Sequence, residues 1–243
     1  MKAVLDELYA RFDAEKFSAG DPCGVVRELM RHTDSQMDIE IGALLVAVIS
    51  WGSRKVFIPV ARHMLRDEMK WHPAEFVMSG AFEHSYQDAK KQCVYRTLNV
   101  PTFQQICRNL CNELQDHATM EQRLAGLSSE EAIAEICRWL EPAKIGTPGK
   151  SACKRVCMFL RWMVRHEKPD FGLWTSRSQS DLYAILDTHV CQLTAPLLEN
   201  SSRSSSSPTW KTCTKLTEIF KSWDAEDPLK YDVALMTLAD AHK

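Results

Sequence analysis

The sequence predicts an all-helical fold, and three observations lead to this class. Apolar residues recur at intervals of three and four along most of the chain, which is the period of one face of an α-helix. Only 9 of the 243 residues are glycine, which argues against a β-sandwich or a doubly wound sheet with many tight turns. Hydrophobic residues make up 45% of the chain, enough for a sizeable core. We therefore expect a single two-lobed helical domain, with lobes at about residues 30–140 and 141–243, the second completed by the N-terminal segment, and no strand.

The first half of the chain contains two strong helical patterns. Residues 38–51 carry a broad apolar face, and Asp38 and Glu40 near its start favour the helix macrodipole. A second helix is expected over residues 55–68, with Pro59 in its first turn, where a proline is tolerated.

Three shorter patterns follow at residues 74–78, 103–114 and 132–140. The last is preceded by Ser128 and Ser129, either of which can cap a helix. Glu131 stands three residues after Ser128, which is the spacing of a capping box.

The second half begins with a turn at residues 141–149, which hold two glycines and two prolines. A serine-rich loop is expected over residues 200–208, and residues 167–181 are expected to be irregular. Helices are expected over residues 151–166, after Asp187, over 210–223, and from 230 to the end.

Charge and composition limit the functions that the chain can have. The formal net charge is −2, so nucleic-acid binding would need a local basic patch. The N-terminus lacks the basic start and apolar run of a signal peptide, and the longest apolar stretch, residues 43–49, is far short of a membrane span. We expect a soluble cytoplasmic protein. Nine cysteines without a C-x-x-C pair or a compact run of four predict reduced thiols, no metal, no iron–sulfur cluster and no other cofactor.

A cationic stripe is the first candidate site. On the helix expected over residues 151–166 and the residue before it, Lys150, Lys154, Arg161 and Arg165 fall within one arc. No acidic residue lies between them to form an i,i+4 pair. The turn before the helix contains Gly146 and Gly149, and free N–H groups at a helix start can bind phosphate. The stripe is therefore either a solvated face or a DNA-backbone contact.

Two further segments carry candidate functional groups. Asp187 precedes an apolar helix, so it is either an N-cap or a carboxylate that stabilises a developing cation. His189, two residues later, is either packed or catalytic. Trp51 and Arg54 follow the apolar helix of residues 38–51, and Trp51 either belongs to the core or stacks on an unpaired base.

These segments, in this order, resemble the helix-hairpin-helix DNA glycosylase superfamily. A more specific similarity, to the DUF2400 family, extends over almost the whole chain. It is carried by Trp51-Gly52, Tyr95-Arg96-Thr97, residues 151–155, 159–165 and 171–174, Leu186-Asp187-Thr188-His189-Val190, and residues 227–232. The resemblance implies a two-lobed helical glycosylase-like fold with an irregular helix-hairpin-helix, because DUF2400 is grouped with these glycosylases by fold.

The resemblance also implies roles for the candidate residues. Lys154 or Lys150 would be the catalytic lysine and Asp187 the catalytic aspartate. The residues implied to contact nucleic acid are Trp51, Arg54, Gly146, Gly149, Arg161, Trp162, Arg165 and His189. The turn between Gly146 and Gly149 is one residue longer than the usual glycine–hydrophobic–glycine hairpin, so phosphate anchoring there is the weakest match.

Three functions remain open on the sequence. The chain could be a DNA N-glycosylase, with or without lyase activity, acting on duplex DNA with a damaged base. It could be a nucleic-acid-binding protein of the same fold without catalysis. It could also be a helical protein unrelated to DNA, in which Arg161 and Arg165 pair with acids elsewhere such as Asp224, Glu226 and Asp227. No membrane partner is expected in any of the three.

Overall fold

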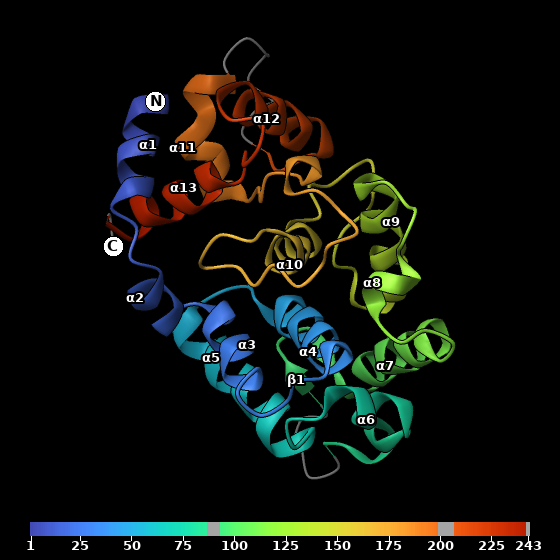
Figure 1. Cartoon of the computed structure of the whole chain (residues 1–243). Helices are drawn as coiled ribbons and strands as arrows, with labels where there is room; N and C mark the ends of the chain where they lie inside the picture. The colour runs from blue at the N-terminus through green and yellow to red at the C-terminus, as the bar shows by residue number, and fades with distance from the viewer. Residues whose placement is uncertain (87–92, 199–206, 242–243) are drawn as a thin grey trace. The chain divides into compact units, whose positions relative to one another are not determined.

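The computed structural model describes residues 1–86, 93–198 and 207–241. Within these ranges the chain forms thirteen α-helices and one two-stranded sheet (Figure 1). The prediction of a helical class is confirmed, and the short sheet corrects the expectation that no strand would form. No helix in this part of the chain has the length and apolar character that crossing a membrane requires.

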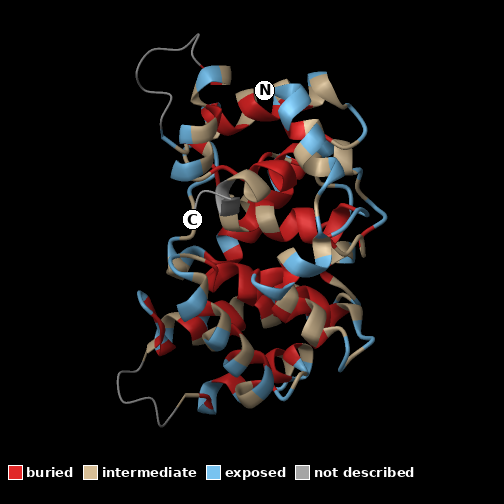
Figure 2. Ribbon diagram, turned by 90° about the vertical axis from the view of Figure 1, so that its left-hand side faces the viewer, coloured by how far each residue is buried: buried red, intermediate tan, exposed pale blue. Residues whose placement is uncertain are grey.

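The chain divides into two compact units. Unit 1 comprises residues 1–14 and 146–243, and unit 2 comprises residues 15–145. Buried residues, red in Figure 2, lie inside both units. Most of the predicted serine-rich loop, residues 199–206, lies outside the described residues.

Unit 2 contains most of the short elements. In chain order they are α2 (Ala14–Ala19, which begins at the last residue of the first part of unit 1), α3 (Pro22–Leu29), α4 (Gln36–Ile49), α5 (Arg54–His63), the π-helical η1 (Met64–Glu68), α6 (Pro73–Met78), η2 (Ala81–His84), β1 (Cys93–Tyr95), β2 (Leu98–Asn99), α7 (Val100–Leu114), α8 (Met120–Arg123), α9 (Ser129–Trp139) and η3 (Glu141–Ala143). Strands β1 and β2 pair antiparallel. The capping box at Ser128 and Glu131 forms as the sequence predicts.

Helix α4 is the central element of unit 2, because every residue from Met37 to Ile49 is buried. Its two acids were expected to interact with the dipole of their own helix, but they also bond to other helices. Asp38 Oδ1 accepts a hydrogen bond from Ala74 N at 2.7 Å, and Glu40 Oε2 accepts one from Met120 N at 2.6 Å. The carboxylates thus satisfy otherwise unpaired N–H groups at the starts of α6 and α8.

Helix α5 departs from its predicted shape. Pro59 lies inside the helix instead of in its first turn, and α5 ends at His63, where η1 begins. A proline in the interior removes one backbone hydrogen bond and crowds the carbonyl four residues earlier.

Unit 1 contains α1 (Lys2–Ala10), α10 (Lys154–Val164), the short η4 (Gln179–Asp181), α11 (Thr188–Leu198), α12 (Trp210–Trp223) and α13 (Lys230–Ala241). Helix α1 packs on α13, although the two come from opposite ends of the chain (Figure 1). Residues 167–181 are irregular apart from η4, as the sequence predicts.

A buried ion network holds the C-terminal end of α10. Arg161 Nε lies 3.0 Å from Asp170 Oδ1, and Arg165 Nη1 lies 3.0 Å from Asp170 Oδ2. Arg165 Nη2 lies 2.7 Å from Asp227 Oδ2 and donates to the Tyr9 hydroxyl at 2.6 Å. The Arg165 side chain is fully buried, and each of its terminal nitrogens has a partner. One side chain therefore joins α10 to α1, to the loop after α10 and to the loop before α13.

We expect Arg165→Ala to destabilise the chain by about 3–5 kcal/mol, because the change leaves Asp227 without its cation and removes one of the two cations that pair with the fully buried Asp170. Urea denaturation gives the change in the free energy of unfolding. Arg66→Ala is the matched control, since within the described residues the ion pair of Arg66 is with its exposed neighbour Asp67, and its unfolding midpoint should match that of the wild type. A loss below about 1 kcal/mol for Arg165→Ala, typical of a surface pair, would show that the network does not hold unit 1 together.

Candidate functional site

An ion pair between Lys154 and Asp187 forms the centre of the candidate site in unit 1. Lys154 is the first residue of α10, and Asp187 directly precedes α11. Lys154 Nζ donates to Asp187 Oδ2 at 2.7 Å, and each side chain is 36% exposed. The structure thus brings together two candidate residues that are 33 positions apart in the sequence, and solvent reaches both.

Asp187 also caps helix α11. Its Oδ1 accepts from Val190 N at 2.9 Å, while its backbone carbonyl accepts from Cys191 N at 2.9 Å. Of the two roles considered from the sequence, the helix cap is therefore confirmed, and the other carboxylate oxygen contacts the Lys154 ammonium. Although partial burial opposes it, the charge and hydrogen bond of Lys154 and the backbone N–H groups hold the pKa of Asp187 below its ordinary value.

The segment that leads to Asp187 is fixed by two buried hydrogen bonds. Ala184 N donates to Thr217 Oγ1 at 2.9 Å, and Ile185 N donates to Asp232 Oδ2 at 2.9 Å. Burial raises the pKa of Asp232 to about 6. Because α12 and α13 each provide one acceptor, the position of Asp187 depends on both helices.

The turn before α10 is held by its own backbone and by residues 208–210. Thr147 N donates to Ser151 Oγ at 2.8 Å, Ala152 N donates to Pro208 O at 3.0 Å, and Trp210 N donates to Lys150 O at 2.8 Å. These bonds place residues 150–152 outside the helix, which corrects the predicted start at 151. They also fix the position from which Lys154 begins α10.

Gly146 and Gly149 are each required in this turn, but for different reasons. At Gly146 a Cβ atom would lie 2.9 Å from Cys153 Sγ, so the close approach itself excludes a side chain. Gly149 has a φ of +72° with open space around it, so its backbone conformation favours glycine. The N–H groups of Thr147, Lys150, Ser151 and Ala152 donate within unit 1, which leaves them unavailable to a phosphate in this arrangement.

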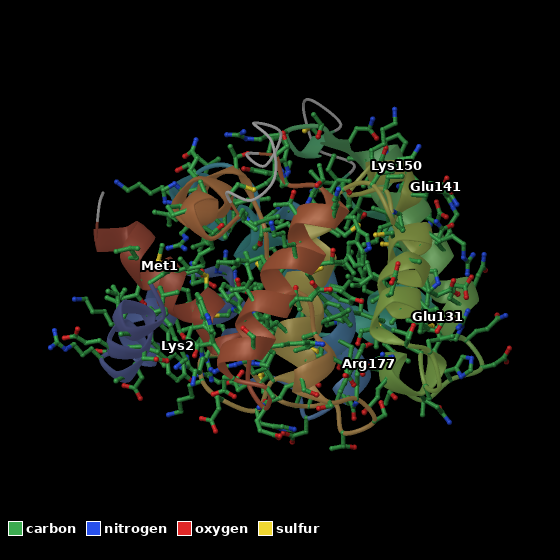
Figure 3. All side chains as sticks on the ribbon, turned by 90° about the horizontal axis from the view of Figure 1, so that it is seen from above. Met1, Lys2, Glu131, Glu141, Lys150 and Arg177 are labelled. Atoms are coloured by element: carbon green, nitrogen blue, oxygen red, sulfur yellow. The ribbon has the colours of Figure 1, made fainter. Side chains whose placement is uncertain are left out.

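The structure separates the two candidate lysines. Lys150 is exposed in the turn, labelled in Figure 3, and its side chain is not part of the pair with Asp187. Lys154 makes that contact. His189 is exposed two residues after Asp187, so of the two alternatives considered for it the structure contradicts the packed one.

Three residues expected to reach nucleic acid are buried instead. Arg161 and Arg165 are 1% and 0% exposed, and Trp162 is 0% exposed. The predicted exposed cationic stripe on α10 is therefore corrected. Arg161 and Arg165 are buried because they pair with Asp170 and Asp227. These acids lie outside the helix, so i,i+4 spacing within α10 could not reveal them as partners. The contact between Arg165 and Asp227 is one of those expected for a helical protein unrelated to DNA, whereas Arg161 pairs with Asp170 instead.

Trp51 and Arg54 belong to unit 2. Trp51 is half-buried at the end of α4, and its carbonyl accepts a hydrogen bond from the Tyr95 hydroxyl at 2.6 Å. Arg54 lies 3.4 Å from Asp21 Oδ2 and 5.7 Å from the centre of the Phe17 ring. Arg96, which lies over Trp51, was not among the candidate site residues, although the Tyr95-Arg96-Thr97 segment of the family resemblance pointed to this position.

All nine cysteines are free thiols. Among the residues that the structure describes, no group of three or more His, Cys, Asp or Glu side chains could hold a metal ion.

Comparison with known proteins identifies a family. A family model described as "Protein of unknown function (DUF2400)" matches residues 21–240. Neither the curated proteins nor the solved structures contain a match to the chain. The matched range includes Lys154, Asp187 and Arg96, so the residues of both units discussed here fall within it.

We expect Asp187→Asn to lower the free energy of unfolding at neutral pH by less than about 1 kcal/mol, because solvent screens a pair this exposed. Asparagine still caps the helix, so the loss isolates the charge. A carboxyl whose native pKa is depressed stabilises the fold above its unfolded pKa, and this contribution disappears as the pH falls through the native pKa. The difference between wild type and variant should therefore begin to shrink near pH 4, the unfolded pKa, and vanish only at pH values below the lower native pKa. Urea denaturation across this range measures it, and a difference that is independent of pH would contradict the charge explanation.

Proposed function

The chain belongs to the DUF2400 family, and we propose that it is a DNA base-excision glycosylase with lyase activity. The observation that carries this proposal is the contact of 2.7 Å between Lys154 Nζ and Asp187 Oδ2, with both groups open to solvent. An amine and a carboxylate held together at the starts of two helices are the groups that nucleophilic attack on a sugar carbon requires.

The proposed chemistry starts with a proton transfer. The Lys154 ammonium passes a proton to Asp187, and the free amine bonds to C1′ of the sugar of the damaged nucleotide. The C1′–N bond breaks, its electron pair leaves with the base, and the base takes up a proton. Asp187 gives that proton to the base, and the carboxylate restored in this way stabilises the positive charge that develops on the sugar. The C1′–O4′ bond then breaks, O4′ takes up the proton that Lys154 Nζ gives up, and the opened sugar is left as a Schiff base between Lys154 Nζ and C1′.

The surroundings of the pair support access by a nucleotide in unit 1. Lys150, in the turn before α10, and His189, in the first turn of α11, are both exposed. A base must leave its stack to reach such a group, and the exposure of the residues next to the pair is compatible with that access. The arginines of α10 contribute nothing to this surface, because Arg161 and Arg165 are buried.

The buried arginines favour a second candidate function. If the charges of unit 1 serve only the fold, the pair of Lys154 and Asp187 is one more internal contact that caps α11, and the chain is a helical protein without a role in DNA. This candidate predicts no DNA binding at low salt. A third outcome, binding without base release, would indicate a non-catalytic nucleic-acid-binding protein.

We expect Lys154→Gln to abolish covalent trapping by borohydride on a duplex that contains the substrate lesion, because the trapped bond forms at Lys154 Nζ. The full chain is incubated with duplexes carrying 8-oxoguanine, uracil, hypoxanthine, thymine glycol or an abasic site, and trapped complexes are separated on a denaturing gel. Asp187→Asn should reduce the rate of trapping by about 10²–10⁴-fold through loss of the proton acceptor.

Lys150→Gln is the matched control, since it removes an equal charge from an exposed lysine four residues away and should leave trapping intact. Trapping that survives Lys154→Gln but disappears in Lys150→Gln would assign the nucleophile to the turn instead. Wild-type protein that traps no lesion and releases no base would reject the glycosylase proposal.

A further inference from the structure

Arg96 lies on the face of Trp51 in unit 2. Its guanidinium carbon is 4.8 Å from the centre of the indole ring and 5.6 Å from the centre of the Tyr95 ring. Arg96 follows strand β1, labelled in Figure 1, and has a φ of +48°, so it stands in the turn of the β1–β2 hairpin. The hairpin that the sequence did not predict is therefore the element that positions this side chain.

Two contacts fix the indole ring of Trp51, on which the Arg96 guanidinium lies. The Tyr95 hydroxyl donates to Trp51 O at 2.6 Å, and the two rings meet edge to face with centres 5.7 Å apart. At Gly52, which has a φ of +83°, a Cβ atom would lie 2.8 Å from Arg96 Cζ. Glycine after the tryptophan thus provides the space that the guanidinium occupies.

Arg96 is exposed, and within residues 1–86, 93–198 and 207–241 no ion pair joins it to a carboxylate. Most other arginines of unit 2 differ in this respect, as Arg62 with Glu28 and Arg108 with Glu83 show. Stacking on an aromatic face holds a guanidinium in one plane and leaves its N–H edge available for an anion with two acceptor oxygens.

From this arrangement we infer that Arg96, stacked on Trp51, binds a backbone phosphate of the DNA on which the chain acts. A planar guanidinium forms two parallel hydrogen bonds to a phosphate, and orienting it beforehand reduces the entropy lost on binding. The inference rests on the proposed function for its ligand. It also changes the role of Trp51, because Arg96 occupies one face of the ring, so the tryptophan supports the cation instead of offering that face to a base.

The test is the salt dependence of DNA binding by the full chain. Affinity for a short labelled duplex is measured by fluorescence anisotropy between about 50 and 200 mM salt, and the logarithm of the association constant is plotted against that of the salt concentration. Loss of one phosphate contact should reduce the magnitude of the slope by about 0.9, and we expect this change in Arg96→Ala. Gly52→Ala, which keeps the charge but places a methyl group where the guanidinium lies, should weaken binding in the same direction.

Arg31→Ala is the matched control, because Arg31 is another exposed arginine of unit 2 with no ion pair in the described residues. Its slope should equal that of the wild type. A wild-type slope in Arg96→Ala, or equal losses in Arg96→Ala and Arg31→Ala, would overturn the phosphate assignment while leaving the proposed function in place. If the wild-type chain binds no duplex at low salt, both the assignment and the proposed function fail.

Discussion

The requirement that every buried charge has a partner determines the arrangement of unit 1. Arg165 is fully buried, and it bonds to Asp170, Asp227 and the Tyr9 hydroxyl. Removing a guanidinium from water costs several kcal/mol unless carboxylates and other acceptors replace the lost hydration. Because these acceptors come from α1, from the loop after α10 and from the loop before α13, the elements must assemble together. Helix α10 is fixed at this end, and Lys154 begins its other end.

In unit 2 the buried charges are carboxylates, and they also have hydrogen-bond partners. Asp38 and Glu40 are buried on α4, and each accepts backbone N–H groups at the start of another helix. In both units, therefore, several charged residues on helices are buried inside the fold. The net charge of −2 is therefore a poor guide to the surface, on which Lys150, in the turn before α10, is exposed.

One residue, Asp187, links the ion pair of the candidate site to the fold. Asp187 closes the N-terminus of α11 with one carboxylate oxygen and holds Lys154 with the other. The helix that it caps thus orients the carboxylate, in addition to the hydrogen bonds from Ala184 and Ile185 that fix the segment before it. Its sequence context indicated the cap, whereas the contact with Lys154 joins residues 33 positions apart and could not be inferred from local spacing.

Local patterns in the sequence determined the helices and many of their ends, because periodicity and capping act over three or four residues. The capping box at Ser128 and the helix after Asp187 are examples. The sequence also identified Lys154 and Asp187 as candidates. Only the tertiary structure decided which side chains are exposed: Arg161 and Arg165 turn inward because Asp170 and Asp227 lie there, and Arg96 reaches Trp51 through a hairpin. Contacts between distant residues depend on how the chain packs, and helical spacing carries no information about them.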